Sequence, residues 1–124
     1  EYISIAELAY ESVISISKYL DLKTIFSFSS LDYVDTKLLD RESRLIEIVK
    51  RNKSSSYINP LGGKELYNKE SFAQHGIELS FIHSNKVTYK QFGNEFVPWL
   101  SIIDVLMFNS TEEINIMLDQ FELL

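Results

Sequence analysis

Apolar side chains recur at helical spacing in the first part of the chain. Over residues 5–20 they fall every three or four positions, with glutamate and lysine side chains between them. Such a stripe buries one face of a helix, so the pattern predicts a helix here. Residues 23–29 are instead rich in β-branched and aromatic side chains, which predicts a strand with Phe26 and Phe28 on one face.

Helical and strand patterns alternate through the middle of the chain. Asp40 precedes an apolar stripe in residues 41–50, which predicts a helix whose first free N–H groups Asp40 caps. Residues 55–58 predict a short strand. The segment 59–63 ends that strand, because its proline lacks a backbone donor and its two glycines favour a turn. Apolar and polar residues alternate strictly over residues 77–81, which is the clearest strand pattern of the chain.

The remaining elements follow from shorter signals. Residues 64–67 can form a helical turn, and residues 87–92 predict a further short strand. A largely apolar run over residues 98–108 predicts a buried helix opened by its proline. Ser110 and Glu113 have capping-box spacing for a last helix, whose apolar residues extend to Phe121.

This order of elements predicts one α/β domain over residues 1–124. The length suits a single hydrophobic core, and the crossovers are long enough to connect parallel strands. We therefore expect a small three-layer domain with a mainly parallel sheet and covering helices. The first residue is Glu1 and the helical pattern starts at once, so we also expect that the natural protein has an upstream portion.

Charge and composition exclude several classes of function. Eighteen acidic and twelve basic residues give a net charge of -6, which disfavours nucleic acid as a partner. The basic residues 50–53 follow a predicted helix, where they suit the helix dipole. The chain has no cysteine, no run long enough to span a bilayer and no signal-peptide pattern, so we expect a cytoplasmic protein. No cofactor is indicated.

Candidate binding residues lie where the predicted strands end. Ligands of parallel sheets bind beyond the carboxyl ends of the strands, which here carry Ser29 and Ser30, the loop from Asn59 to Lys64, and His83. In the loop, Gly62 and Gly63 can expose successive N–H groups while Lys64 supplies a positive charge, an arrangement suited to a phosphate or carboxylate. Alternatively, the loop is only a tight turn with Lys64 in water, and both interpretations stay open.

The two histidines carry weaker signals. His75 and His83 lie eight positions apart on different predicted elements, so no metal site is expected from them. At its strand end, His83 is a candidate acid or base, although a hydrogen-bonded histidine at the rim of a sheet is the commoner case. The glycine loop is not a Walker loop, because Ile58 and Glu65 stand where that motif needs glycine and a hydroxyl.

Several segments in fixed order resemble the C-terminal half of WbqC-like proteins. They are Tyr-Ile-Asn-Pro-Leu-Gly-Gly-Lys-Glu-Leu-Tyr at residues 57–67, Gly-Ile-Glu-Leu-Ser-Phe at 76–81, Tyr-Lys-Gln at 89–91, and Phe-Val-Pro-Trp-Leu-Ser-Ile-Ile-Asp-Val-Leu-Met-Phe-Asn at 96–109. Residues 40–109 carry the strong part of the resemblance. Two departures stand out. Asn59-Pro60 replaces a Ser-Gly pair common in the family, and the family's aromatic-rich N-terminal half is missing.

The resemblance implies a role in bacterial surface-polysaccharide (O-antigen) biosynthesis, with acyl or aminoacyl transfer to an activated amino sugar as the reaction expected of such a transferase. An activated sugar or acyl donor would be held by Asn59, Gly62, Gly63 and Lys64, with Tyr67, Tyr89 and Gln91 nearby. The alternative is a non-catalytic protein-interaction module or the structural half of a larger enzyme, because the residues form no complete acid/base or nucleophile set. A homo-oligomer is compatible with either function.

Overall fold

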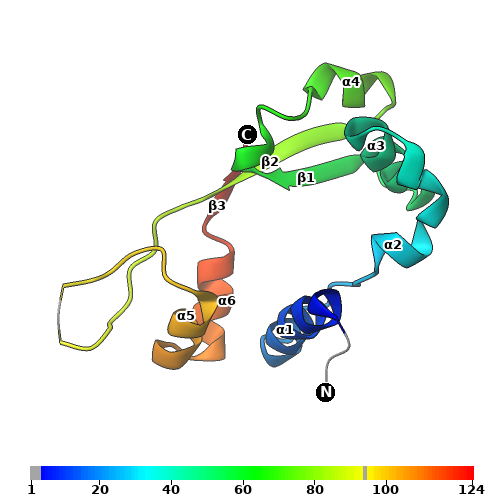
Figure 1. Ribbon diagram of the computed structural model, residues 1–124. Coiled ribbons are helices and arrows are strands. Elements are labelled where there is room, and N and C mark those ends of the chain that lie inside the picture. The colour runs from blue at the N-terminus through cyan, green and yellow to red at the C-terminus, as the bar shows by residue number, and fades with distance from the viewer. Residues whose placement is uncertain (1–3, 94) are drawn as a thin grey trace. The chain divides into compact units, whose positions relative to one another are not determined.

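The computed structural model describes residues 4–93 and 95–124, which fall into two compact units. The helical unit comprises residues 1–26 and 86–120, and the sheet unit comprises residues 27–85 and 121–124. The chain therefore leaves the sheet unit after residue 85 and returns to it at residue 121, as its colours show in Figure 1.

The sheet unit contains a three-stranded sheet with short helices. Strands β1 and β2 are parallel, with Tyr57 opposite Leu79, and β3 is antiparallel to β2, with Glu122 opposite His83. The strand order is β1-β2-β3. The elements of this unit are α2 (Ser29–Asp32), the 3-10 helix η1 (Val34–Leu38), α3 (Arg41–Arg51), β1 (Ser56–Pro60), the 3-10 helix η2 (Leu61–Gly63), α4 (Lys69–Gln74), β2 (Glu78–Ser84) and β3 (Phe121–Leu123).

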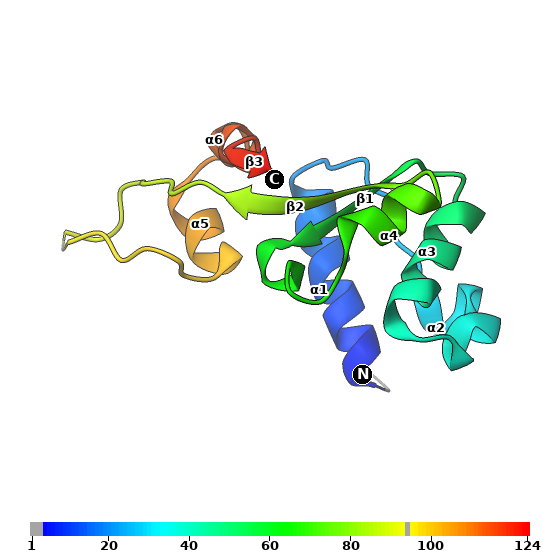
Figure 2. The same ribbon diagram turned by 90° about the horizontal axis from the view of Figure 1, so that it is seen from above.

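The core of the sheet unit lies where α3 and α4 pack on the strands. Leu79 and Phe81 of β2 are buried, whereas Glu78 is exposed and Ser80 is half-buried. The core therefore lies on one face of the strand. Figures 1 and 2 show α3 and α4 next to β1 and β2. The cluster consists of Ile46, Val49, Phe72, Ile77, Leu79 and Phe81. Burial of these side chains provides the main stabilisation of the unit.

The helical unit is built from three helices and irregular segments. They are α1 (Ile5–Tyr19), α5 (Ile102–Phe108) and α6 (Thr111–Leu118). Helices α1 and α6 both begin with a capping box, formed by Ser4 with Glu7 and by Ser110 with Glu113. Leu20 and Ile114 are almost fully buried. No helix among the described residues is both long and apolar enough to cross a membrane.

Several predicted elements are confirmed with small changes of boundary. The helices predicted at residues 5–20 and 41–50 are α1 and α3, and Asp40 caps α3 by accepting hydrogen bonds from the N–H groups of Glu42 and Ser43. The strands predicted at 55–58 and 77–81 are β1 and β2. Gly76 adopts a left-handed conformation (φ 72°) directly after the C-cap of α4, a position that glycine occupies without strain.

Two predicted strands are wrong. Residues 23–28 are irregular and Ser29 begins α2, while the described residues between 87 and 92 are also irregular. Ile25 is 94% exposed, and among the described residues no strand pairs with this segment. β-Propensity mainly measures packing against such neighbours, and without them it does not specify a strand.

The predictions for the last third and for the sheet also need correction. Pro98 does not open a helix, because Trp99 has φ 61° and α5 begins only after its N-cap Ser101. Residues 64–66 form turns rather than a helical turn, and Phe121 lies in β3 instead of the last helix. The small α/β fold is confirmed, but the sheet is mixed, so a mainly parallel three-layer arrangement is not confirmed.

Candidate functional site

A hollow of about 440 Å³ in the sheet unit gathers three basic side chains, and we call it the cationic hollow. The basic residues are Lys37, Arg41 and Arg44. Its other lining residues are Ser29, Leu39, Leu45, Ile48 and Tyr67. The lining thus combines three positive charges with the hydroxyl groups of Ser29 and Tyr67 and with three apolar side chains. This combination suits an anion attached to a partly apolar molecule.

Local structure explains why these cations converge. Lys37 lies in η1, and Arg41 and Arg44 lie three residues apart at the start of α3, so they share one side of that helix. Asp40 caps the same helix, and the hydrogen bond from Ser43, together with backbone N–H groups, lowers the pKa of the Asp40 carboxyl. The negative charge of Asp40 is therefore stabilised at the N-terminus of α3.

Arg44 is the best positioned of the three cations. Its Nε donates to Thr36 Oγ1 (3.2 Å) and its Nη2 to the Ser29 carbonyl oxygen (3.3 Å). Thr36 is itself 1% exposed and donates to the Tyr33 carbonyl oxygen. A guanidinium has five N–H donors, so these bonds fix its orientation and leave donors for a ligand.

The other charged groups nearby are used within the protein. Arg51 donates to both carboxylate oxygens of Asp35 (2.9 and 2.7 Å) and to Glu47 (2.8 Å), and the bond from Arg51 lowers the pKa of Asp35. Glu42 accepts from the Asn68 N–H. Among the described residues, no carboxylate forms an ion pair with Lys37, Arg41 or Arg44.

In the Asn59–Lys64 loop, Gly63 lies close to the Asn59 side chain. The Asn59 amide donates to the Tyr57 hydroxyl (2.8 Å) and lies against Gly63. A methyl group at Gly63 would fall 2.1 Å from Asn59 Oδ1 and 3.4 Å from the Tyr67 ring. The same ring packs edge-on against Phe72 and lines the cationic hollow. Gly63 of the loop therefore lies next to the Tyr67 ring, which lines the cationic hollow.

The structure brings together only part of the predicted site. Ser29 and Tyr67 line the cationic hollow, whereas Ser30 lies in α2 outside its lining. Gly62 is exposed in η2, and within residues 4–93 and 95–124 the exposed Lys64 side chain has no ion pair. His83 is an exposed residue of β2 opposite Glu122.

Tyr89 and Gln91 belong to the helical unit, where they share one acceptor. The Tyr89 hydroxyl and the Gln91 amide both donate to Asp104 Oδ2, at 2.5 and 3.0 Å. The hydrogen bond to Asp104 raises the pKa of Tyr89, because the nearby carboxylate disfavours the phenolate. Gln91 also binds both the N–H and the carbonyl of Val97, so this network organises the segment before α5.

Sequence reasoning missed the residues that matter most in both places. Arg41 and Arg44 are three apart, a spacing that predicts one helical face once a helix start at Asp40 is recognised, whereas Lys37 precedes that helix and no sequence signal places it beside them. Asp104 lies within the apolar run 98–108, and no sequence signal indicates that its carboxylate joins Tyr89 to Gln91. No group of three or more histidine, aspartate or glutamate side chains in the described part of the chain could hold a metal ion.

Residues 1–116 match the sequence model of the WbqC-like protein family. The match extends over nearly the whole chain and is not restricted to residues 40–109. No curated protein and no solved structure is significantly similar to the chain.

Proposed function

Because the chain belongs to the WbqC-like protein family, we propose that it binds an activated, anionic building block of bacterial surface polysaccharide in the cationic hollow. The ligand class is an activated amino sugar or an acyl or aminoacyl donor, and the protein serves acyl or aminoacyl transfer between them in the cytoplasm. The observation that carries the proposal is the convergence of Lys37, Arg41 and Arg44, without an ion-pairing carboxylate among the described residues.

The chemistry of the lining suits such a ligand. Both activated sugars and acyl donors carry phosphate or carboxylate oxygens, which charge-assisted hydrogen bonds from arginine and lysine recognise. The Tyr67 hydroxyl and Ser29 add groups that can bind sugar hydroxyls, while Leu45 and Ile48 offer apolar contact. The reacting group would have to come from the substrates or from residues outside this hollow, because its lining includes no carboxylate, histidine or cysteine.

The proposal is tested by calorimetric titration with nucleotide-sugars and with acyl and aminoacyl donors. Lys37→Ala and Arg41→Ala should each weaken binding of the recognised ligand by about 1 kcal/mol, roughly fivefold. Lys90→Ala is the matched control, because Lys90 is an exposed cation of the helical unit outside the cationic hollow. Neither variant should lower the unfolding temperature, since both side chains are exposed.

Lys64→Ala separates the cationic hollow from the glycine loop. If the loop supports Tyr67 without contacting the anion, this variant binds as tightly as the parent. Weaker binding by Lys64→Ala, together with unchanged binding by Lys37→Ala and Arg41→Ala, would indicate that the anion binds at the loop and not in the cationic hollow. No binding of any ligand class by the parent protein would reject the proposal.

A second candidate is a non-catalytic binding module that self-associates. It is favoured by the apolar surface of the helical unit, where Phe92, Ile103 and Met107 are 81%, 62% and 77% exposed around one hollow. Apolar patches of this kind mark interaction sites. Sedimentation at increasing concentration should then show a homo-oligomer that Met107→Glu abolishes and Ile25→Glu, at another exposed position, leaves intact.

A further inference from the structure

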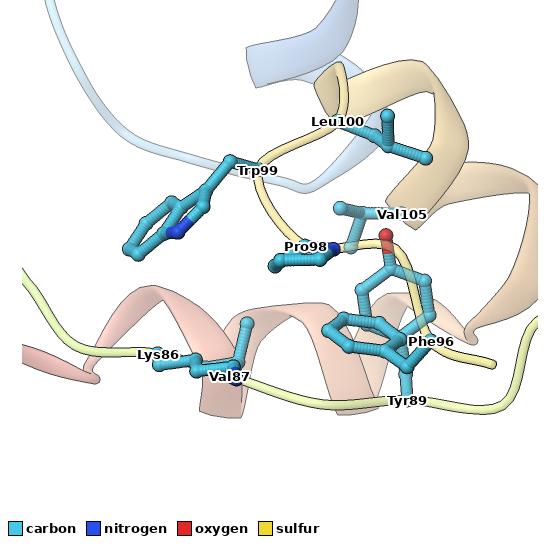
Figure 3. A pocket seen from close by; sticks show the side chains of 8 residues that line it. All are labelled: Lys86, Val87, Tyr89, Phe96, Pro98, Trp99, Leu100 and Val105. Atoms are coloured by element: carbon cyan, nitrogen blue, oxygen red, sulfur yellow. The ribbon is translucent and has the colours of Figure 1, made fainter.

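Another hollow lies entirely within the helical unit, and rings form half of its lining residues, so we call it the aromatic hollow (Figure 3). Its volume is about 140 Å³. Figure 3 shows the Trp99 indole on one side of Pro98 and the rings of Tyr89 and Phe96 on the other. The remaining lining residues are Lys86, Val87, Leu100 and Val105.

Trp99 is the unusual residue of this hollow. It has φ 61°, a left-handed conformation that bulky side chains rarely adopt, and its side chain is 72% exposed. Such strain persists only where the surrounding structure maintains it, and it concentrates at ligand-binding segments. Burial does not explain the conformation of Trp99, because most of its surface contacts solvent.

Hydrogen bonds and ring contacts fix the opposite wall. Tyr89 and Phe96 pack edge to face, with ring centroids 5.2 Å apart and planes at 82°. Asp104 holds the Tyr89 hydroxyl, and Gln91 binds the backbone of Val97 between Phe96 and Pro98. The wall is therefore organised before any ligand arrives, which lowers the entropy lost on binding.

The size and chemistry of the aromatic hollow select its occupant. Apolar cavities of roughly 150 Å³ hold one benzene ring. The Tyr89 hydroxyl already donates to Asp104, so few polar groups remain for the hydroxyls of a sugar ring. Lys86 contributes a positive charge and has no ion pair among the residues that the structure describes. We propose that the aromatic hollow binds one six-membered aromatic ring that carries an anionic group near Lys86.

The only tryptophan of the protein provides the readout. The fluorescence of Trp99 is followed during titration with phenyl phosphate, cyclohexyl phosphate and inorganic phosphate. The Lys37→Ala/Arg41→Ala variant serves as background, because binding in the cationic hollow is weakened there. Phenyl phosphate should change the emission saturably, and the other two should bind about tenfold more weakly or not at all, since stacking needs a π-face.

Two sources of such a ring can be told apart in the same assay. Uridine monophosphate offers a pyrimidine ring on a ribose phosphate, whereas phenyl phosphate places the anion directly on the ring. Tighter binding of uridine monophosphate than of both phenyl phosphate and ribose 5-phosphate assigns the ring to a nucleotide. Tighter binding of phenyl phosphate assigns it to an aryl acid. Both results support the aromatic hollow as a ring site.

Three variants test the residues. Lys86→Ala should weaken phenyl phosphate binding about two- to fivefold, and Lys90→Ala, the next lysine along the chain, should not. Trp99→Gly should abolish binding measured by calorimetry while the unfolding temperature stays equal or rises, because glycine relieves the left-handed strain. Equal binding of phenyl and cyclohexyl phosphate, an unchanged emission, or unimpaired binding by Trp99→Gly would overturn the proposal. None of these outcomes bears on the cationic hollow, so the two proposals fail separately.

Discussion

The sheet unit and the helical unit differ in how much apolar side chain they bury. Six buried apolar residues form one cluster in the sheet unit. In the described part of the helical unit, Leu20 and Ile114 are the buried apolar residues, while Ile5 and Met107 remain 88% and 77% exposed. The cationic hollow is therefore supported by a packed core, and the aromatic hollow by hydrogen bonds and ring contacts along an irregular segment.

This difference shows two ways to hold a binding surface. In the sheet unit, Tyr67 lines the cationic hollow and packs on Phe72, which is fully buried. In the helical unit, Tyr89 is held through its hydroxyl by one carboxylate, Asp104. We therefore expect core substitutions to have large effects on the sheet unit, and polar substitutions to have smaller and pH-dependent effects on the helical unit.

The largest expected effect is that of Phe72→Ala. The Phe72 ring is 0% exposed, stacks on Tyr57 and meets the edge of Tyr67, so its removal leaves a cavity in the core. The free energy of unfolding should fall by about 3–5 kcal/mol. Phe92→Ala, a matched change at an 81% exposed ring that contacts Phe108, should cost about 1 kcal/mol. Urea denaturation measures both, and equal losses would remove the contrast between the units.

An intermediate effect is expected from Gly63→Ala. The new methyl group would fall 2.1 Å from Asn59 Oδ1 and 2.9 Å from its Cγ, so the Asn59 side chain must move and lose its bond to Tyr57. We expect a loss of about 1–3 kcal/mol. Gly62→Ala is the control, because nothing lies within 4 Å of its added methyl group. Thermal unfolding of the two variants should differ clearly, and similar curves would show that Asn59 moves without penalty.

The smallest effect is expected from Asp104→Asn and depends on pH. The pKa of Tyr89 is raised above 10.0 chiefly by its bond to Asp104. A raised pKa in the folded state means that this stabilisation is complete below the unfolded pKa and is lost as pH rises through the folded value. At neutral pH, Asp104→Asn should cost about 1 kcal/mol. In the variant, the pKa of Tyr89 should move back towards 10.0, which ultraviolet titration measures. An unchanged titration curve would exclude Asp104 as the cause of the raised pKa.

Local signals predicted the elements with strong caps and clear periodicity. Asp40 before α3, the box of Ser110 with Glu113 at α6 and the alternation in β2 are each decided by neighbours in sequence. Residues 23–28 and 87–92 failed because strands need partners that the sequence does not reveal. Strand β3 was missed because only its pairing with β2, distant in sequence, makes it a strand.

The candidate site could be predicted only in part for the same reason. Ser29 and Tyr67 were singled out and do line one hollow, but the convergence of Lys37 with Arg41 and Arg44 depends on η1 packing beside α3. Of the two glycines, only Gly63 meets a steric requirement, because an added methyl group at Gly62 has no neighbour within 4 Å. Gly63 is needed for the close approach of Asn59 and does not have a positive φ.

The interruption of the sheet unit by residues 86–120 has a consequence for synthesis on the ribosome. Strands β1 and β2 leave the ribosome before the strand that pairs with the other side of β2 has been made. Translation adds about 5–20 residues per second, so the open edge of β2 exists for a time on the order of seconds. An open strand edge is a template for pairing with other chains. The nascent protein is therefore most exposed to aggregation, and to capture by chaperones, while its helical unit is being translated.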